Sequence, residues 1–193
     1  MTKKMSKHSY INRVAAIVSI LAIILIFVSC GFETYTPDRG KIISVCIDNR
    51  QKLIKCAEEV LAYKSDVYIS STDKYPIEDK TINGLYRADV VDGKNKNISA
   101  IDSENVRTVL ETCGVVSIAA NSGKNYSVCE FSCGGSGRYY FGVYYSVTDV
   151  PVFLSDFSVE LIKSDGGFIY KSSDVTYYTE KIADKLYYYE ATY

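Results

Sequence analysis

The sequence predicts an α+β domain built on one mainly antiparallel sheet with two amphipathic helices, preceded by an N-terminal signal segment. Three observations indicate this fold class. The first 29 residues are basic and then apolar, two later stretches repeat apolar residues at helical spacing, and the remainder alternates short apolar runs with turn-forming residues. We therefore divide the chain into a signal at 1–29, a tether at 30–41 and a domain at 42–193.

The N-terminal segment has the layout of a secretory signal. Basic residues as far as Arg13 precede an apolar run at 14–28. As a helix this run would be roughly 22 Å long, which is short against a hydrocarbon core of about 30 Å. The length favours a cleaved signal, and the alternative is an uncleaved signal anchor in a thinned bilayer. Both interpretations place the residues from Gly31 onward outside the cell.

The end of the apolar run carries a more specific pattern. Phe27-Val28-Ser29-Cys30 resembles the bacterial lipobox, in which an aliphatic residue, a small or β-branched residue and Gly, Ala or Ser precede a Cys; Phe27 departs from the usual Leu. The resemblance implies cleavage between Ser29 and Cys30 and a diacylglyceryl group on the Cys30 thiol. Membrane lipid would then hold the protein on the outer face of the cell membrane, because two acyl chains anchor stably.

Two stretches of the domain have the spacing of amphipathic helices. The first spans 49–64, and Asp48 and Gln51 have the spacing of a capping box at its start. The second begins after Ser103 as N-cap and stops at Gly114. Its expected buried stripe comprises Val106, Val109, Leu110 and Cys113.

The remaining residues favour strands joined by hairpin turns. A first pair is expected at 85–91 and 97–101 around a turn at 92–95, a three-stranded meander at 115–120, 126–133 and 138–147, and a closing hairpin at 175–181 and 186–193. In the middle strand of the meander, alternation places one set of side chains on a single face, which we expect to be buried. This set is Ser127, Cys129, Phe131 and Cys133.

The cysteines indicate a core held mainly by packing. If Cys30 carries lipid, an odd number remains, so they cannot all pair within one chain. One interpretation is buried thiols, since free Cys behaves as a small apolar residue. The other is one disulfide, with Cys46 and Cys56 among the candidates. The five remaining cysteines are Cys46, Cys56, Cys113, Cys129 and Cys133.

Several kinds of chemistry are disfavoured by residue type. The one histidine, His8, lies in the signal, so the domain offers no His-dependent triad, Cys–His pair or His-containing zinc site. No Cys-x-x-Cys pair exists to begin a four-Cys metal site, and we expect no metal or other cofactor. Four of the 22 basic residues precede the apolar run, which leaves 18 against 23 acidic residues and a charge of −5. Nucleic-acid binding is therefore disfavoured.

Tyrosine is the unusual component of the domain. Twelve of the eighteen tyrosines lie from Tyr126 onward, many in adjacent pairs, and alternation sends adjacent residues to opposite faces of a strand. Cross-strand packing is the plainer interpretation. The functional alternative is an outward aromatic surface, including Tyr140 and Tyr144, that binds a protein, a peptide or a cell-wall glycan.

The segments at 137–146, 177–182 and 186–190 resemble stretches in small uncharacterised lipoproteins of Gram-positive bacteria. The resemblance implies a lipid anchor, a C-terminal sheet and a cell-surface location, and it brings no catalytic residue. The sequence thus favours a non-enzymatic surface lipoprotein that binds a ligand at the cell envelope. The alternatives are an envelope hydrolase that uses Asp and Glu carboxylates and a protective protein of the immunity type.

Overall fold

The computed structural model describes residues 38–70, 81–82, 85–122 and 126–193. The chain divides into two compact units, Met1–Thr36 and Pro37–Tyr193, and everything described belongs to the second. The predicted signal, Cys30 and most of the predicted tether lie outside the described residues. Within the described ranges, no helix has both the length and the apolar character that crossing a membrane requires.

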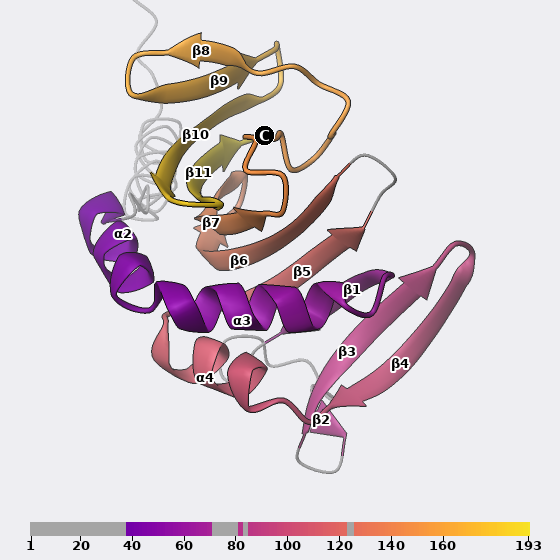
Figure 1. Ribbon diagram of the computed structural model, residues 1–193. Coiled ribbons are helices and arrows are strands. Elements are labelled where there is room, and N and C mark those ends of the chain that lie inside the picture. Colours follow the sequence, from indigo (N-terminus) through magenta and orange to yellow (C-terminus); the bar gives the residue numbers. More distant parts are fainter. Residues whose placement is uncertain (1–37, 71–80, 83–84, 123–125) are drawn as a thin grey trace, which may run out of the picture. The chain divides into compact units, whose positions relative to one another are not determined.

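One antiparallel sheet organises the described unit (Figure 1). Its path runs β2-β3-β1-β5-β6-β7-β11-β10-β9-β8, and β4 also pairs with β3. The strands are β1 (Asp66–Ser70), β2 (Thr81–Ile82), β3 (Leu85–Asp92), β4 (Asn95–Ile101), β5 (Ser117–Ser122), β6 (Ser127–Ser136), β7 (Tyr139–Ser146), β8 (Ile162–Ser164), β9 (Gly167–Lys171), β10 (Thr176–Ala183) and β11 (Leu186–Thr192).

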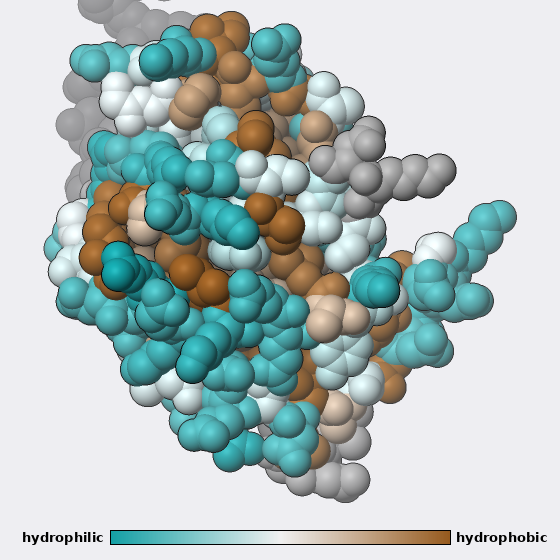
Figure 2. All heavy atoms as spheres, in the orientation of Figure 1, coloured by the Kyte–Doolittle hydropathy of each residue, from teal (hydrophilic) through white to brown (hydrophobic). Residues whose placement is uncertain are grey.

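Within the described ranges, three helices accompany this sheet: α2 (Arg39–Asp48), α3 (Arg50–Leu61) and α4 (Glu104–Thr112). The α3 helix contacts β5, β6, β7 and α4, and α2 contacts α3 and β10. On the face shown in Figure 2, hydrophilic side chains cover most of the surface over α3 and α4, as expected of amphipathic helices. Their apolar sides therefore face the sheet.

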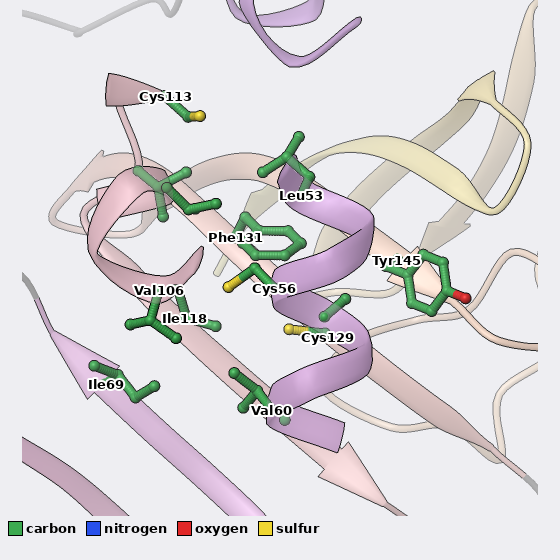
Figure 3. Packing of buried hydrophobic residues seen from close by; sticks show 14 of the residues in the cluster. Leu53, Cys56, Val60, Ile69, Val106, Cys113, Ile118, Cys129, Phe131 and Tyr145 are labelled. Carbon is green, nitrogen blue, oxygen red and sulfur yellow. The ribbon is translucent and has the colours of Figure 1, made fainter. Parts of the chain in front are cut away.

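The main core lies between the helices and the sheet. Leu53, Cys56 and Val60 follow one another along the inner side of α3 and meet Cys129 and Phe131 of β6, as Figure 3 shows. All five are fully buried. Residues three or four apart on a helix share a face, and so do residues two apart on a strand. The apolar face of α3 therefore packs on the apolar face of β6.

A second core covers the opposite face of the sheet. The segment 147–161 brings Phe153 over β7, β10 and β11, where it packs with Val128, Tyr144, Tyr177, Tyr187, Tyr189 and Ala191. The prediction of a buried face is confirmed for Cys129 and Phe131, whereas Ser127 and Cys133 of the same predicted set are only partly buried. It was incomplete, because Val128 on the other face is buried as well.

Most of the predicted elements form, and the exceptions lie near the start of the domain. The second predicted helix is confirmed: the Ser103 side chain accepts a bond from the Val106 amide, and α4 stops before Gly114. The meander and both hairpins are confirmed too. The capping box at Asp48 is wrong, because Asp48 ends α2 and Asn49 caps α3 without a side-chain bond.

The predicted start of the first helix near Asn49 is confirmed by α3, but an additional helix, α2, precedes it. The Asp38 side chain accepts from the Lys41 amide at 3.0 Å, so Arg39 to Lys41 belong to α2 and not to a tether. The α3 helix also ends at Leu61, three residues before the predicted end. Besides α2, the strands β1, β2, β8 and β9 had not been predicted.

Candidate functional site

Two pockets border the segment 147–161. The larger, about 610 Å³, is mostly apolar and includes Tyr126, Phe157, Glu160 and Phe168. The smaller, about 210 Å³, is what we call the tyrosine pocket, and it is lined by Glu130, Tyr140, Leu154, Ser155, Tyr177, Tyr189, Ala191 and Tyr193. Four tyrosines around a single carboxylate make the smaller pocket the chemically more distinctive of the two.

Strand register assembles the tyrosine pocket. Ala191 of β11 stands between Tyr140 of β7 and Tyr177 of β10, so these three side chains form a row across three strands. In the next row, Gly142 is the partner of Tyr189. A side chain at Gly142 would collide with the β6 backbone, where the register shifts between Ser132 and Gly134. In the lining itself, the small side chain of Ala191 lies between the larger rings of Tyr140 and Tyr177.

The tyrosine rings pack as two pairs. Tyr177 stacks with Tyr189 at 6.1 Å between ring centroids, and Tyr140 meets the edge of Tyr193 at 5.8 Å. A hydrogen bond between the Ser155 and Tyr193 hydroxyls ties the second pair to the segment 147–161. Tyr140 is 45% exposed and Tyr193 is 37% exposed, whereas Tyr177 and Tyr189 are buried. The pocket thus has a closed side and an open side.

Glu130 is the charged group of the pocket. Its carboxylate accepts a hydrogen bond from the Tyr189 hydroxyl. Burial raises the pKa of Glu130, and the bond from Tyr189 acts in the opposite direction. The same burial, together with the charge of Glu130, raises the pKa of Tyr189 well above its usual value. When Glu130 is ionised, Tyr189 keeps its proton and donates it in the hydrogen bond to the carboxylate.

Tyr177 is the second notable polar group. Its hydroxyl is buried and makes no hydrogen bond within the described part of the chain. The Tyr144 and Thr179 hydroxyls lie near enough to influence its pKa, yet the geometry forms no bond to either. Buried hydroxyls are seldom left in this state, because an unmade bond costs about 1–3 kcal/mol.

Tyr144 is not on the surface, so its predicted outward position is wrong. The side chain is fully buried and stacks on Tyr187 at 5.2 Å. Its hydroxyl accepts from the Val152 amide at 3.1 Å and is hydrogen-bonded to the Thr179 hydroxyl at 3.0 Å. The physical reason is the segment 147–161, which covers this part of β7.

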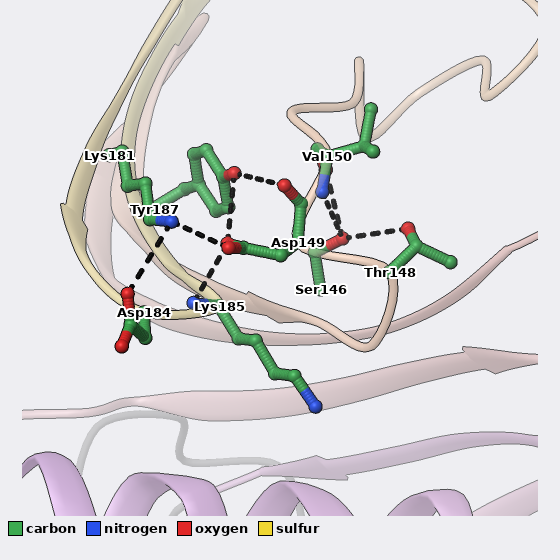
Figure 4. A network of polar contacts seen from close by, with 8 residues as sticks. All are labelled: Ser146, Thr148, Asp149, Val150, Lys181, Asp184, Lys185 and Tyr187. Atoms are coloured by element: carbon green, nitrogen blue, oxygen red, sulfur yellow. Dashed lines mark hydrogen bonds and ion pairs between the residues drawn. The ribbon is translucent and has the colours of Figure 1, made fainter.

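A polar network fixes the start of the covering segment (Figure 4). Asp149 has a positive φ of 55°, which is uncommon for a residue with a side chain. Its carboxylate accepts from Lys181 Nζ at 2.5 Å and from the Lys185 amide at 2.9 Å, and its carbonyl accepts from the Tyr187 hydroxyl at 2.8 Å. The bond from Lys181 lowers the pKa of Asp149. These contacts hold the start of the segment 147–161 against β10 and β11.

Carboxylates elsewhere in the C-terminal strands already have partners. Arg39 of α2 binds Glu180 through two nitrogens, at 2.9 and 2.6 Å. Glu190 accepts from Tyr139 at 2.8 Å and from Tyr188 at 2.7 Å. The two pockets contribute one carboxylate each, so neither contains the facing pair that a glycosidase requires.

The described cysteines belong to the core. Cys46 and Cys56, the candidates for a disulfide, are free and fully buried, as is Cys129. Burial raises the pKa of Cys56 to about 12, which keeps it a thiol. The interpretation as buried thiols is confirmed for these residues. Among the described residues, no group of three His, Cys, Asp or Glu side chains is arranged to hold a metal ion.

Several pocket residues were not singled out from sequence. Glu130, Tyr177, Tyr189 and Tyr193 meet only in the folded chain, and of the two predicted tyrosines only Tyr140 lies in the pocket. One signal was present for Glu130, because it is a charged residue between two buried ones in an apolar strand. Comparisons with protein-family models, with curated proteins and with solved structures gave no match.

Proposed function

We propose that the chain is a surface lipoprotein, exported by its N-terminal segment and anchored by lipid on Cys30, whose folded domain binds a ligand without chemical change. The likeness of 27–30 to a lipobox supports the anchor, and the tyrosine pocket supports binding. The ligand of this proposal is a protein, a peptide or a cell-wall glycan. The domain acts on the outer face of the cell membrane.

The observation that carries the binding role is the composition of the tyrosine pocket. Aromatic rings offer large, stiff contact surfaces, and a single carboxylate gives direction to a polar group. Its volume of about 210 Å³ is smaller than the roughly 300–1,000 Å³ of most small-molecule sites. The pocket therefore suits one side chain or one head group of a larger ligand. With one carboxylate and no neighbouring base, binding is favoured over hydrolysis.

The anchor is tested by mass spectrometry of the N-terminal peptide from membranes, alongside a Cys30→Ser variant. Wild type is expected to begin at Cys30 and to carry the added mass of a diacylglyceryl group. The variant is expected to keep residues 1–29 and to lack the lipid. An intact, unmodified N-terminus in wild type would overturn the lipid anchor in favour of an uncleaved signal anchor.

The binding role is tested with the detergent-solubilised full-length chain, purified cell-wall glycan and peptides released from that wall. Tyr140→Ala is the site variant, and Tyr63→Ala is a matched control, since the two tyrosines are 45% and 46% exposed. Binding should fall in the Tyr140 variant and persist in the control. Equal binding by both variants would show that the tyrosine pocket is not the binding site.

A further inference from the structure

We propose that the tyrosine pocket binds a primary ammonium group on a peptide, such as a lysine side chain or a free amino terminus. This inference rests on the binding role proposed above and names the chemical group that the pocket recognises. Three properties of the pocket lead to it: its charge, its hydrogen-bonding capacity and its size.

The charge of the pocket favours a cation. Glu130 is the charged side chain of the lining, and none of the basic residues that the structure describes takes part in it. Tyrosine rings present negative faces, so they attract cations and repel anions. A carboxylate, phosphate or sulfate would meet both Glu130 and the ring faces. A cation would compensate the charge of Glu130, whose ionised form is disfavoured by burial, which raises its pKa.

Hydrogen bonding distinguishes among cations. A primary ammonium has three N–H donors, whereas a quaternary ammonium has none. Glu130 uses one bond from Tyr189 and keeps further lone pairs for a ligand. Tyr177 belongs to the lining of the same pocket, but its hydroxyl is buried beside Tyr144 and Thr179 and is not open to a ligand. A primary ammonium beside Glu130 would donate to these remaining lone pairs, and a quaternary head group could not.

The size and lining of the pocket fit a charged head on an apolar stem. Leu154 and Ala191 supply the apolar part of the wall, and the volume is about 210 Å³. Tyr140 and Tyr193 are partly exposed, so the open side lies at their rings. A lysine-type side chain would pass these rings with its methylenes and place its ammonium at Glu130, as long amphipathic side chains do elsewhere.

The test uses the full-length protein in a non-ionic detergent with n-butylammonium, 1-pentanol and choline as probes, and reads binding by ligand-detected NMR. The first two probes have similar shapes but differ in charge. We expect butylammonium to bind at least ten-fold more tightly than pentanol and choline. Equal binding of pentanol would overturn the role of charge. Choline binding as tightly as butylammonium would overturn the preference for a primary amine.

Glu130→Gln tests the residue on which the proposal depends. This variant is expected to bind butylammonium at least ten-fold more weakly, whereas Glu160→Gln in the larger pocket should bind as wild type does. Undiminished binding by Glu130→Gln would overturn the inference. Tyr140→Ala provides a second reading at an exposed position, should the Gln variant fold poorly, and is expected to bind several-fold more weakly.

The inference and the proposed function fail in different ways. If butylammonium does not bind, yet wall glycan or peptide binds in a manner that depends on Tyr140, the binding role stands and the ammonium specificity is wrong. If neither butylammonium nor any wall component binds in that manner, both are wrong.

Discussion

The same chemical change at two neighbouring tyrosines is expected to have opposite effects on stability. Tyr177→Phe removes a buried hydroxyl that has no hydrogen-bond partner among the described residues, and the remaining ring keeps its contacts with Phe153 and Tyr189. An unsatisfied buried hydroxyl costs about 1–3 kcal/mol, so this substitution should stabilise the protein by about 1 kcal/mol or more. Tyr144→Phe instead leaves the Val152 amide without its acceptor and should destabilise by a similar amount.

Urea unfolding measures both effects. The chain has eighteen tyrosines and no tryptophan, so tyrosine fluorescence and circular dichroism can follow the transition. With a slope of about 2 kcal/mol per molar urea, a change of about 1 kcal/mol moves the midpoint by about 0.5 M. The midpoint should rise for Tyr177→Phe and fall for Tyr144→Phe. A fall for both would show that the Tyr177 hydroxyl has a partner in the folded protein, and the reasoning would be wrong.

Three further predictions concern other parts of the domain. Burial raises the pKa of Glu130 above its ordinary 4.5, so the wild type should lose stability relative to Glu130→Gln as pH rises from about 4.5 through the pKa of the folded state. Urea midpoints of both proteins across that pH range measure the difference. Midpoints that change in parallel with pH would contradict this prediction. Ser103→Ala removes the side-chain acceptor of the Val106 amide and should cost about 1 kcal/mol in thermal unfolding, whereas Ser103→Thr should retain most of it; equal losses would exclude capping as the cause. Cys56 should resist alkylation in the folded protein and react after unfolding in urea, as mass spectrometry of the labelled peptides would show, and rapid labelling of the native protein would contradict its burial.

The sequence predicted correctly those elements that have both a start signal and a stop signal next to them in the chain. The α4 helix has Ser103 before it, an apolar stripe within it and Gly114 after it, and Gly114 adopts the positive φ of 68° that a helix stop favours. The hairpin of β3 and β4 likewise turns at Gly93, with φ at 60°. In these elements the residues that decide the structure are neighbours in sequence.

Errors arose where two interpretations compete locally. Pro37 and Gly40 are typical of a tether, and they obscured Asp38 as the cap of α2. Asp48 and Asn49 correctly indicate the start of α3, but they also end α2, so the Asp48 side chain does not act as the cap. The β1 strand shows alternation at Val67 and Ile69, but five residues are too few for that pattern to exclude a loop.

The site was less predictable than the fold because its residues meet through long-range packing. Tyr140 and Tyr144 lie four positions apart on β7 and share a face, so alternation treats them alike. Tyr140 is exposed and Tyr144 is buried because the segment 147–161 covers only one of them. The meeting of Glu130 with Tyr177 and Tyr189 depends on the order β6-β7-β11-β10, which no local pattern indicates.

That strand order has a consequence for how the domain folds. β11 is the last strand along the described chain, yet it lies inside the sheet, between β7 and β10. Until Leu186–Thr192 arrives, the edge of β7 has no strand to pair with on that side, and an unpaired edge invites association with other chains. Both cores and the tyrosine pocket contain side chains of β11, so none of them is complete until these seven residues have joined the sheet. A chain that crossed the membrane unfolded would complete its sheet only after those residues had followed.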